Sequence, residues 1–125
     1  MSSPEAKIKQ DLLTEIQILS ENYKLLASFT AGTDYDPATV GNGMQTFKDS
    51  LSRASAYVLA LYNLKGQRVN IPWEPLFTSL DYAIATLSAS ATIKQRDAVR
   101  AILAMAQEQM KQVMSYFAAL KESLK

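Results

Sequence analysis

The sequence predicts an all-α protein that forms an antiparallel four-helix bundle with up-down-up-down connectivity and heptad-like packing. Apolar residues recur at steps of three and four along most of the chain, which is the spacing of one helix face. The four glycines and four prolines concentrate in a few breaks between these segments. Strand-like alternation is confined to 69–71, which is too short to form a sheet. Because the connections are short, neighbouring helices are expected to be antiparallel.

The first helix is predicted at about 4–29. Ser3 can accept a hydrogen bond from the first turn as an N-cap, and Pro4 suits the first helical position. Gly32 lies just beyond the expected end of the helix. The inward stripe consists of Ile8, Leu12, Ile16, Leu19, Tyr23 and Leu26.

The second helix is predicted at about 42–65, and its start can be placed in two ways. Asp36 and Pro37 form a cap followed by proline, whereas Asn42 and the residue three positions later resemble a capping box. Since Gly41 and Gly43 weaken any helix that contains them, we expect a short turn at Pro37 and a main helix from Asn42. Gly66 should end this helix. Its stripe consists of Val40, Met44, Phe47, Leu51, Ala54, Val58 and Leu61.

The third and fourth helices are predicted at about 74–91 and 93–123. Thr92 and Gln95 form a capping box, which favours two helices, although one long bent helix would also fit the pattern. Leu51 and Val113 lie in the middle of their stripes and are predicted to be core residues. The two stripes consist of Leu76, Leu80, Ala83 and Leu87, and of Val99, Leu103, Ala106, Met110, Val113, Phe117, Leu120 and Leu124.

Composition excludes several classes of function. The length of 125 residues indicates a single domain, 1–125. The chain has no Cys and no His, which excludes disulfides, thiolate chemistry, Ser-His-Asp triads and di-iron sites of the Glu-x-x-His type. The inward stripes contain no carboxylate of the kind that enzymes tune inside a core. We therefore expect a protein that is not an enzyme, with no catalytic residues, no cofactor and no metal.

The acidic residues Asp34 and Asp36 do not change this expectation. A calcium loop needs alternating oxygen ligands, a central glycine and a distant glutamate, whereas Pro37 follows at once here. We interpret the segment as a turn with an N-cap.

Charge and hydropathy limit the partners. The formal net charge of +1 provides no general attraction to phosphates, which disfavours nucleic acid as a partner without excluding it. No apolar run has the length of a membrane span, and the first residues do not resemble a signal peptide. A cytoplasmic location is the expectation, with the mature form of a processed protein as the alternative.

An uncharged stretch at 56–64 is the strongest pointer to function. Leu59 falls outside the stripe of its helix, and a helix that is apolar on all sides is normally buried on all sides. Either this helix forms an interface, or its flanks fill a wide core. Trp73, the only tryptophan, can either cap the core or anchor a partner. The candidate interface consists of Tyr57, Leu59, Tyr62, Leu64 and Trp73.

A weaker candidate site is a basic group at the start of the fourth helix. Lys94, Arg96 and Arg100 could contact anions, although a solvated face is the ordinary explanation of such a short run. The sequence thus favours a non-enzymatic protein-interaction module, an adaptor, assembly factor, chaperone-like or regulatory subunit, which binds a protein partner, a second copy of itself, or both. The alternatives are a helical subunit of a nucleoprotein assembly and a carrier of an apolar ligand in the bundle core.

Overall fold

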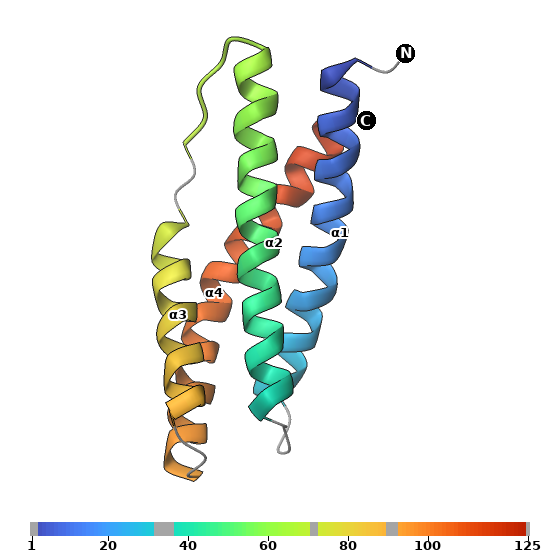
Figure 1. Cartoon of the computed structure of the whole chain (residues 1–125). Helices are drawn as coiled ribbons and strands as arrows, with labels where there is room; N and C mark the ends of the chain where they lie inside the picture. Colours follow the sequence, from blue (N-terminus) through green and yellow to red (C-terminus); the bar gives the residue numbers. More distant parts are fainter. Residues whose placement is uncertain (1–2, 32–36, 71–72, 90–92, 125) are drawn as a thin grey trace.

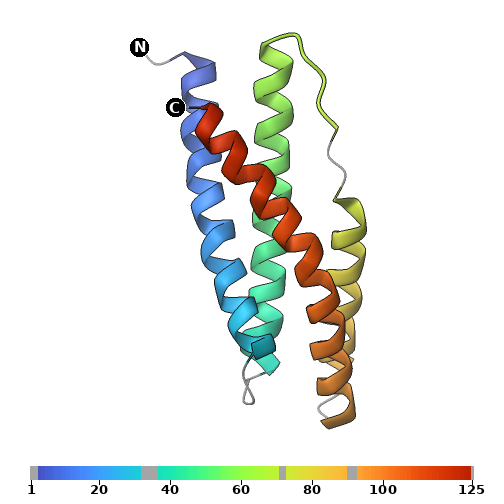
Figure 2. The ribbon, with the colours of Figure 1, turned by 180° about the vertical axis from the view of Figure 1, so that it is seen from behind.

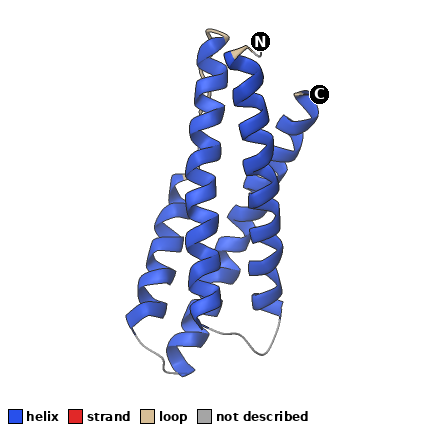
Figure 3. Cartoon of the chain, turned by 45° about the vertical axis from the view of Figure 1, so that its right-hand side comes forward, coloured by secondary structure: helices blue, strands red, loops and turns tan. Residues whose placement is uncertain are grey.

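The computed structural model describes residues 3–31, 37–70, 73–89 and 93–124. In this part of the chain there are four helices and no strand (Figure 3), which confirms the all-α prediction. The helices are α1 (Pro4–Ala31), α2 (Pro37–Leu64), α3 (Glu74–Ala89) and α4 (Ile93–Ser123). α3 and α4 pack against each other, so they are two helices and not one long bent helix.

The helices pack as two neighbouring pairs that also touch each other. α1 contacts α2 and α4, and α3 contacts the same two helices. Figure 1 shows α1 and α2 side by side along most of their length, while α4 crosses behind them obliquely. Figure 2, seen from behind, shows α4 reaching α1 at the end of the molecule where both termini lie.

Cross-helix contacts give the relative direction of α2 and α3. Lys48 of α2 pairs with Asp81 of α3. Farther along α2, Ser55 accepts a 2.9 Å hydrogen bond from the indole N–H of Trp73, which immediately precedes α3. The two helices therefore run in opposite directions where they meet, and α3 begins beside Ser55, short of the C-terminal end of α2.

The predicted helix signals at Ser3 and Gly66 are confirmed. Ser3 Oγ accepts a 3.1 Å hydrogen bond from the backbone N–H of Ala6, as an N-cap does. Gly66 has a φ of 67°, in the left-handed region that favours glycine. The Gln67 N–H donates to the Tyr62 carbonyl at 2.9 Å, and the Gly66 N–H donates to the Asn63 carbonyl at 3.0 Å. This pair of bonds is a Schellman motif, which satisfies carbonyls at the end of the helix.

The predicted start of the second helix is wrong. α2 begins at Pro37 and runs without interruption through Gly41 and Gly43. A Cβ atom at Gly43 would lie only 3.2 Å from Cδ2 of Leu26 on α1, so the glycine permits a close approach of the two helices. Glycine inside a helix costs about 1 kcal/mol relative to alanine, and burial of Leu26 against α2 offsets a cost of this size. Packing between helices therefore overrides local propensity here.

The predicted stripes form the core. Leu51 has no exposed surface and Val113 is 3% exposed, which confirms both as core residues. The stripe members Ile8, Tyr23 and Leu124 are only partly buried, because they lie at the edges of the core. The side chains of Leu87 and Val99, and the predicted caps Asp36 and Thr92, lie outside what the structure describes. The largest fully buried side chains are Phe47, Phe117, Leu12, Leu19, Leu26, Met44, Leu51, Leu61, Leu76, Leu80, Leu103 and Met110.

Candidate functional site

The structure does not bring the five predicted interface residues together. Leu59 and Leu64 are exposed, at 43% and 55%, while Tyr57 and Tyr62 are half-buried. Leu59 and Leu64 are five positions apart on one helix, so their side chains point about 140° away from each other. Tyr57 lies one turn beyond Arg53, which contacts α1, whereas Leu59 and Tyr62 are only about 60° apart on a different side of α2. The predicted residues of α2 therefore do not form one patch. Leu59 and Tyr62 lie on one side of the helix, and Tyr57 and Leu64 point elsewhere.

Trp73 caps the core instead of lying on the surface. It is only 6% exposed, and its ring meets Tyr116 edge-on with centroids 5.2 Å apart. It also lies 5.4 Å from the ring of Phe117. Edge-to-face pairs of this kind stabilise a core beyond the area that they bury. The structure thus favours the core-capping interpretation over the partner-anchor interpretation.

Tyr116 is the residue that the sequence reasoning missed. It contacts Trp73 and makes a T-shaped pair with Phe117 at 5.4 Å. Burial raises the pKa of the Tyr116 hydroxyl, and the nearby Tyr62 hydroxyl raises it further. A signal was present in the sequence, since an uncharged line runs along one side of this helix next to the apolar stripe. The line consists of Gln109, Gln112, Tyr116, Ala119 and Ser123.

Two hollows adjoin Tyr116. One has a volume of about 340 Å³ and lies between the start of α3 and α4. The other has a volume of about 240 Å³ and is lined by Tyr62, Ala119, Leu120, Ser123 and Tyr116 itself. Among the described residues, no charged side chain lines either hollow. The lining of the larger hollow consists of Trp73, Pro75, Leu76, Gln109, Gln112, Val113 and Tyr116.

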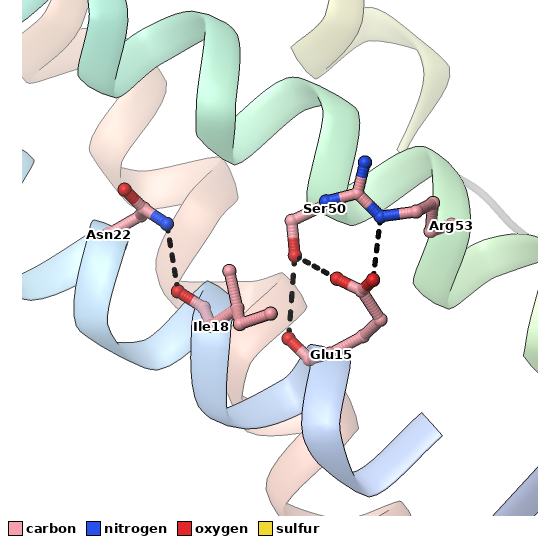
Figure 4. A network of polar contacts seen from close by, with 5 residues as sticks. All are labelled: Glu15, Ile18, Asn22, Ser50 and Arg53. Atoms are coloured by element: carbon pink, nitrogen blue, oxygen red, sulfur yellow. Dashed lines mark hydrogen bonds and ion pairs between the residues drawn. The ribbon is translucent and has the colours of Figure 1, made fainter. Parts of the chain in front are cut away.

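A buried polar cluster joins α1 to α2 (Figure 4) and corrects the expectation that no carboxylate points inward. Glu15 is 7% exposed. Its Oε2 accepts a 2.7 Å hydrogen bond from the Ser50 hydroxyl, and its Oε1 accepts a 2.6 Å bond from Arg53 Nε. The hydrogen bond to Glu15 raises the pKa of Arg53 above its ordinary value. Sequence periodicity did not identify Glu15, because the partners that make its burial possible are on another helix.

This cluster is arranged for packing rather than for chemistry. Ser50 beside a carboxylate resembles a nucleophile with a base, but Ser50 has no exposed surface, so a substrate cannot reach its hydroxyl in this conformation. The same carboxylate is occupied by Arg53. A second polar contact in Figure 4, from the Asn22 side chain to the Ile18 carbonyl at 3.0 Å, lies within α1. We interpret Glu15, Ser50 and Arg53 as a clamp between the two helices.

The described residues do not provide an anion site in the basic group at the start of α4. Lys94 and Arg96 lie in the first turn of α4, and their side chains lie outside what the structure describes. Arg100 is half-buried and already engaged in an interaction. The predicted turn at Asp34 and Asp36 also lies outside the described residues.

The described residues contain neither a metal-binding cluster nor a membrane-spanning helix. Within 3–31, 37–70, 73–89 and 93–124, no group of three or more Asp or Glu residues is placed to hold a metal ion. None of the helices in those same ranges has the length and apolar character needed to cross a membrane. Comparison of the chain with known protein families, with characterised proteins and with solved structures finds no match.

Proposed function

We propose that this chain is a non-enzymatic protein-interaction module, built as an antiparallel four-helix bundle with up-down-up-down connectivity, that associates with a second copy of itself through α2. The bundle assignment is supported by the neighbour pattern, in which each helix packs against two others, and by the opposite directions of α2 and α3. The 4–3 spacing of the buried residues is typical of helices that pack at shallow angles.

One observation carries the functional proposal. Four exposed residues follow one another at steps of four, three and four along the outside of α2, and none is charged. We call this set the α2 strip, and it consists of Ser52, Ala56, Leu59 and Asn63. By contrast, the exposed residues of α1 include Lys7, Glu21 and Lys24. An uncharged line at helical spacing on the outside of a helix is suited to packing against another helix.

The position of α3 explains why part of this strip is uncovered. Trp73 is held beside Ser55, so α3 begins short of the C-terminal end of α2 and descends from there (Figure 1). Beyond Ser55, the chain alongside α2 on the α3 side is the segment 65–70 (Figure 1), in which every residue except Val69 is exposed. Leu59 therefore keeps 43% of its surface. Burial of such area is worth roughly 25 cal/mol per Å².

The strip is suited to self-association because a two-fold interface joins the same surface on both subunits. Ser52 and Ala56 are small and allow a second helix to approach closely, and Leu59 would supply the apolar centre. A stable interface buries about 800 Å² on each partner, so the contact would extend from Leu59 to neighbours such as Tyr62.

Sedimentation of the parent and two lysine variants tests the proposal. Leu59→Lys should shift the protein towards monomer and raise the dissociation constant at least tenfold, because the ammonium would be buried without a partner. Leu25→Lys is the matched control, since Leu25 is 41% exposed on α1 and lies outside the strip. It should leave the oligomeric state unchanged.

Two results would contradict the proposal. The first is equal sedimentation of Leu59→Lys and Leu25→Lys at every concentration. The second is a monomeric parent that loses much of its thermal stability on Leu59→Lys, which would show that Leu59 packs within its own chain.

A further inference from the structure

The segment 65–70 follows α2 and leads from the pair α1–α2 towards the pair α3–α4 (Figure 1). It contains two basic residues, Lys65 and Arg68, and both are exposed. We propose that the Arg68–Val69 peptide bond is a cleavage site for an endoprotease that cuts after basic residues, and that the four helices of the cut chain remain packed together. This processing of the chain does not depend on self-association through the α2 strip.

The backbone beyond Gln67 lacks the hydrogen bonds that protect a helix. Gly66 and Gln67 donate to carbonyls at the end of α2, so the bond after Lys65 lies inside the Schellman motif. Among the described residues, no backbone hydrogen bond holds 68–70, and these three positions belong to no helix or strand. Exposed connections of this kind are the preferred sites of proteolytic nicking. A protease can therefore engage Arg68 after a local movement, in which the half-buried Val69 leaves the edge of the core.

The distribution of basic residues makes the site selective. Apart from Lys65, Arg68 and Lys125, every lysine and arginine lies within α1, α2 or α4, where helical hydrogen bonds hold the backbone. The sequence between α1 and α2 offers no alternative site, because no basic residue occurs between Lys24 and Lys48. Residues 90–92, between α3 and α4, contain no lysine or arginine either.

The Arg68 side chain is available for recognition. It is exposed, and it makes no ion pair within the part of the chain that the structure describes. Proteases that cut after basic residues recognise this side chain through a carboxylate in the specificity pocket. The reaction is a hydrolysis, in which water adds across the C–N bond and leaves a carboxylate on Arg68 and an amine on Val69.

Contacts across the cut would hold the two pieces together. One piece would contain α1 and α2 and the other α3 and α4, and these meet where α1 packs on α4 and α2 packs on α3. The 2.9 Å hydrogen bond from Trp73 to Ser55 and the ion pair of Lys48 with Asp81 also join the pieces. The buried residues of all four helices form a single cluster, to which 65–70 adds only the half-buried Val69.

Limited digestion with trypsin tests the proposal, because trypsin cuts after lysine and arginine. A brief digestion of the native full chain should give 1–68 and 69–125 as the first products, identified by their intact masses. In native buffer the two pieces should elute together from a size-exclusion column at the position of the uncut protein. They should also keep its helical circular dichroism.

Two variants locate the cut. Arg68→Gln should slow the loss of the intact chain at least about tenfold, because it removes the side chain that the protease recognises. Lys24→Gln is the matched control, since Lys24 is equally basic and exposed but lies within α1. It should leave the rate within about twofold of the parent, because a helical site is protected.

Leu51→Ala tests whether cutting requires unfolding of the whole chain. If it does, a core defect of the size expected for Leu51→Ala would raise the unfolded population, and with it the rate, at least about thirtyfold. Cutting through a local opening of 65–70 should instead change by less than about threefold.

Four results would overturn the proposal. They are first products that end at a residue other than Arg68, equal rates for the parent and Arg68→Gln, and pieces that separate on the size-exclusion column. The fourth is an acceleration by Leu51→Ala of the size that global unfolding requires, because 65–70 would then have no special accessibility.

Discussion

The indole nitrogen of Trp73 donates a 2.9 Å hydrogen bond to the hydroxyl of Ser55, and this contact sets the level at which α3 begins beside α2. The Ser55 hydroxyl in turn donates to the Leu51 carbonyl at 2.7 Å, so the indole is tied to the backbone of α2. The position of Trp73 next to Tyr116 and Phe117 follows from the same contact. The start of α3, the core cap and the hollow beside Tyr116 therefore depend on one another.

Ser55→Ala should lower the free energy of unfolding by about 1–3 kcal/mol, because it leaves the buried indole N–H without an acceptor. Ser52→Ala, at an exposed serine on the same helix, should change the free energy of unfolding by less than about 0.5 kcal/mol. Urea denaturation followed by Trp73 fluorescence measures both variants. Equal midpoints for the two variants would show that the Trp73–Ser55 bond does not stabilise the fold.

Leu51→Ala should lower the free energy of unfolding by about 2–5 kcal/mol, because Leu51 has no exposed surface and its truncation leaves a cavity. The same change at Leu59, which is 43% exposed, removes a side chain that already contacts solvent and should cost less than half as much. Chemical denaturation monitored by circular dichroism compares them. A Leu51→Ala midpoint equal to that of the parent would mean that the core of α2 is wrongly assigned.

Glu15→Gln should lower the free energy of unfolding by about 1–3 kcal/mol, because Glu15 is buried and an amide cannot accept at both positions that Ser50 and Arg53 address. Arg53→Met should cost no more than about 1 kcal/mol, since the Arg53 side chain is 49% exposed and solvent screens its ion pair. Denaturant midpoints at low and high salt measure both changes. A larger loss for Arg53→Met than for Glu15→Gln would show that the ion pair, and not the buried carboxylate, dominates the clamp.

Tyr116 should make stability depend on alkaline pH. Its pKa is raised in the folded protein above the ordinary value of 10.0, so the neutral phenol is favoured by folding. This contribution is fully present below about pH 10 and is lost as the pH rises through the higher pKa of the folded state. Tyr116→Phe should therefore show a smaller loss of stability between pH 7 and about pH 11 than the parent.

Urea midpoints at both pH values measure this dependence. Tyr82→Phe, at an exposed tyrosine of α3, is the comparison. If Tyr82→Phe reduced the alkaline loss as much as Tyr116→Phe does, the effect would belong to tyrosine removal in general.

The local features of this protein were predictable from the sequence. The all-α fold, the core stripe through Leu51, the cap at Ser3 and the end of α2 at Gly66 depend on residues only a few positions apart. Helical periodicity and capping chemistry act over one or two turns, so they can be recognised without knowledge of which helices meet.

Only the tertiary structure decided which residues form the buried clamp and the hollow. Glu15 and Ser50 are 35 positions apart, and Trp73 and Ser55 are 18 apart. The sequence favoured a start at Asn42, but contact with Leu26 makes Gly43 suitable inside a helix that begins at Pro37. Tyr116 became a candidate site residue because the packing of α3 against α4 brings Trp73 beside it. Burial, close approach and unsatisfied polar atoms are properties of pairs of helices, and the pattern within one helix does not specify its partner.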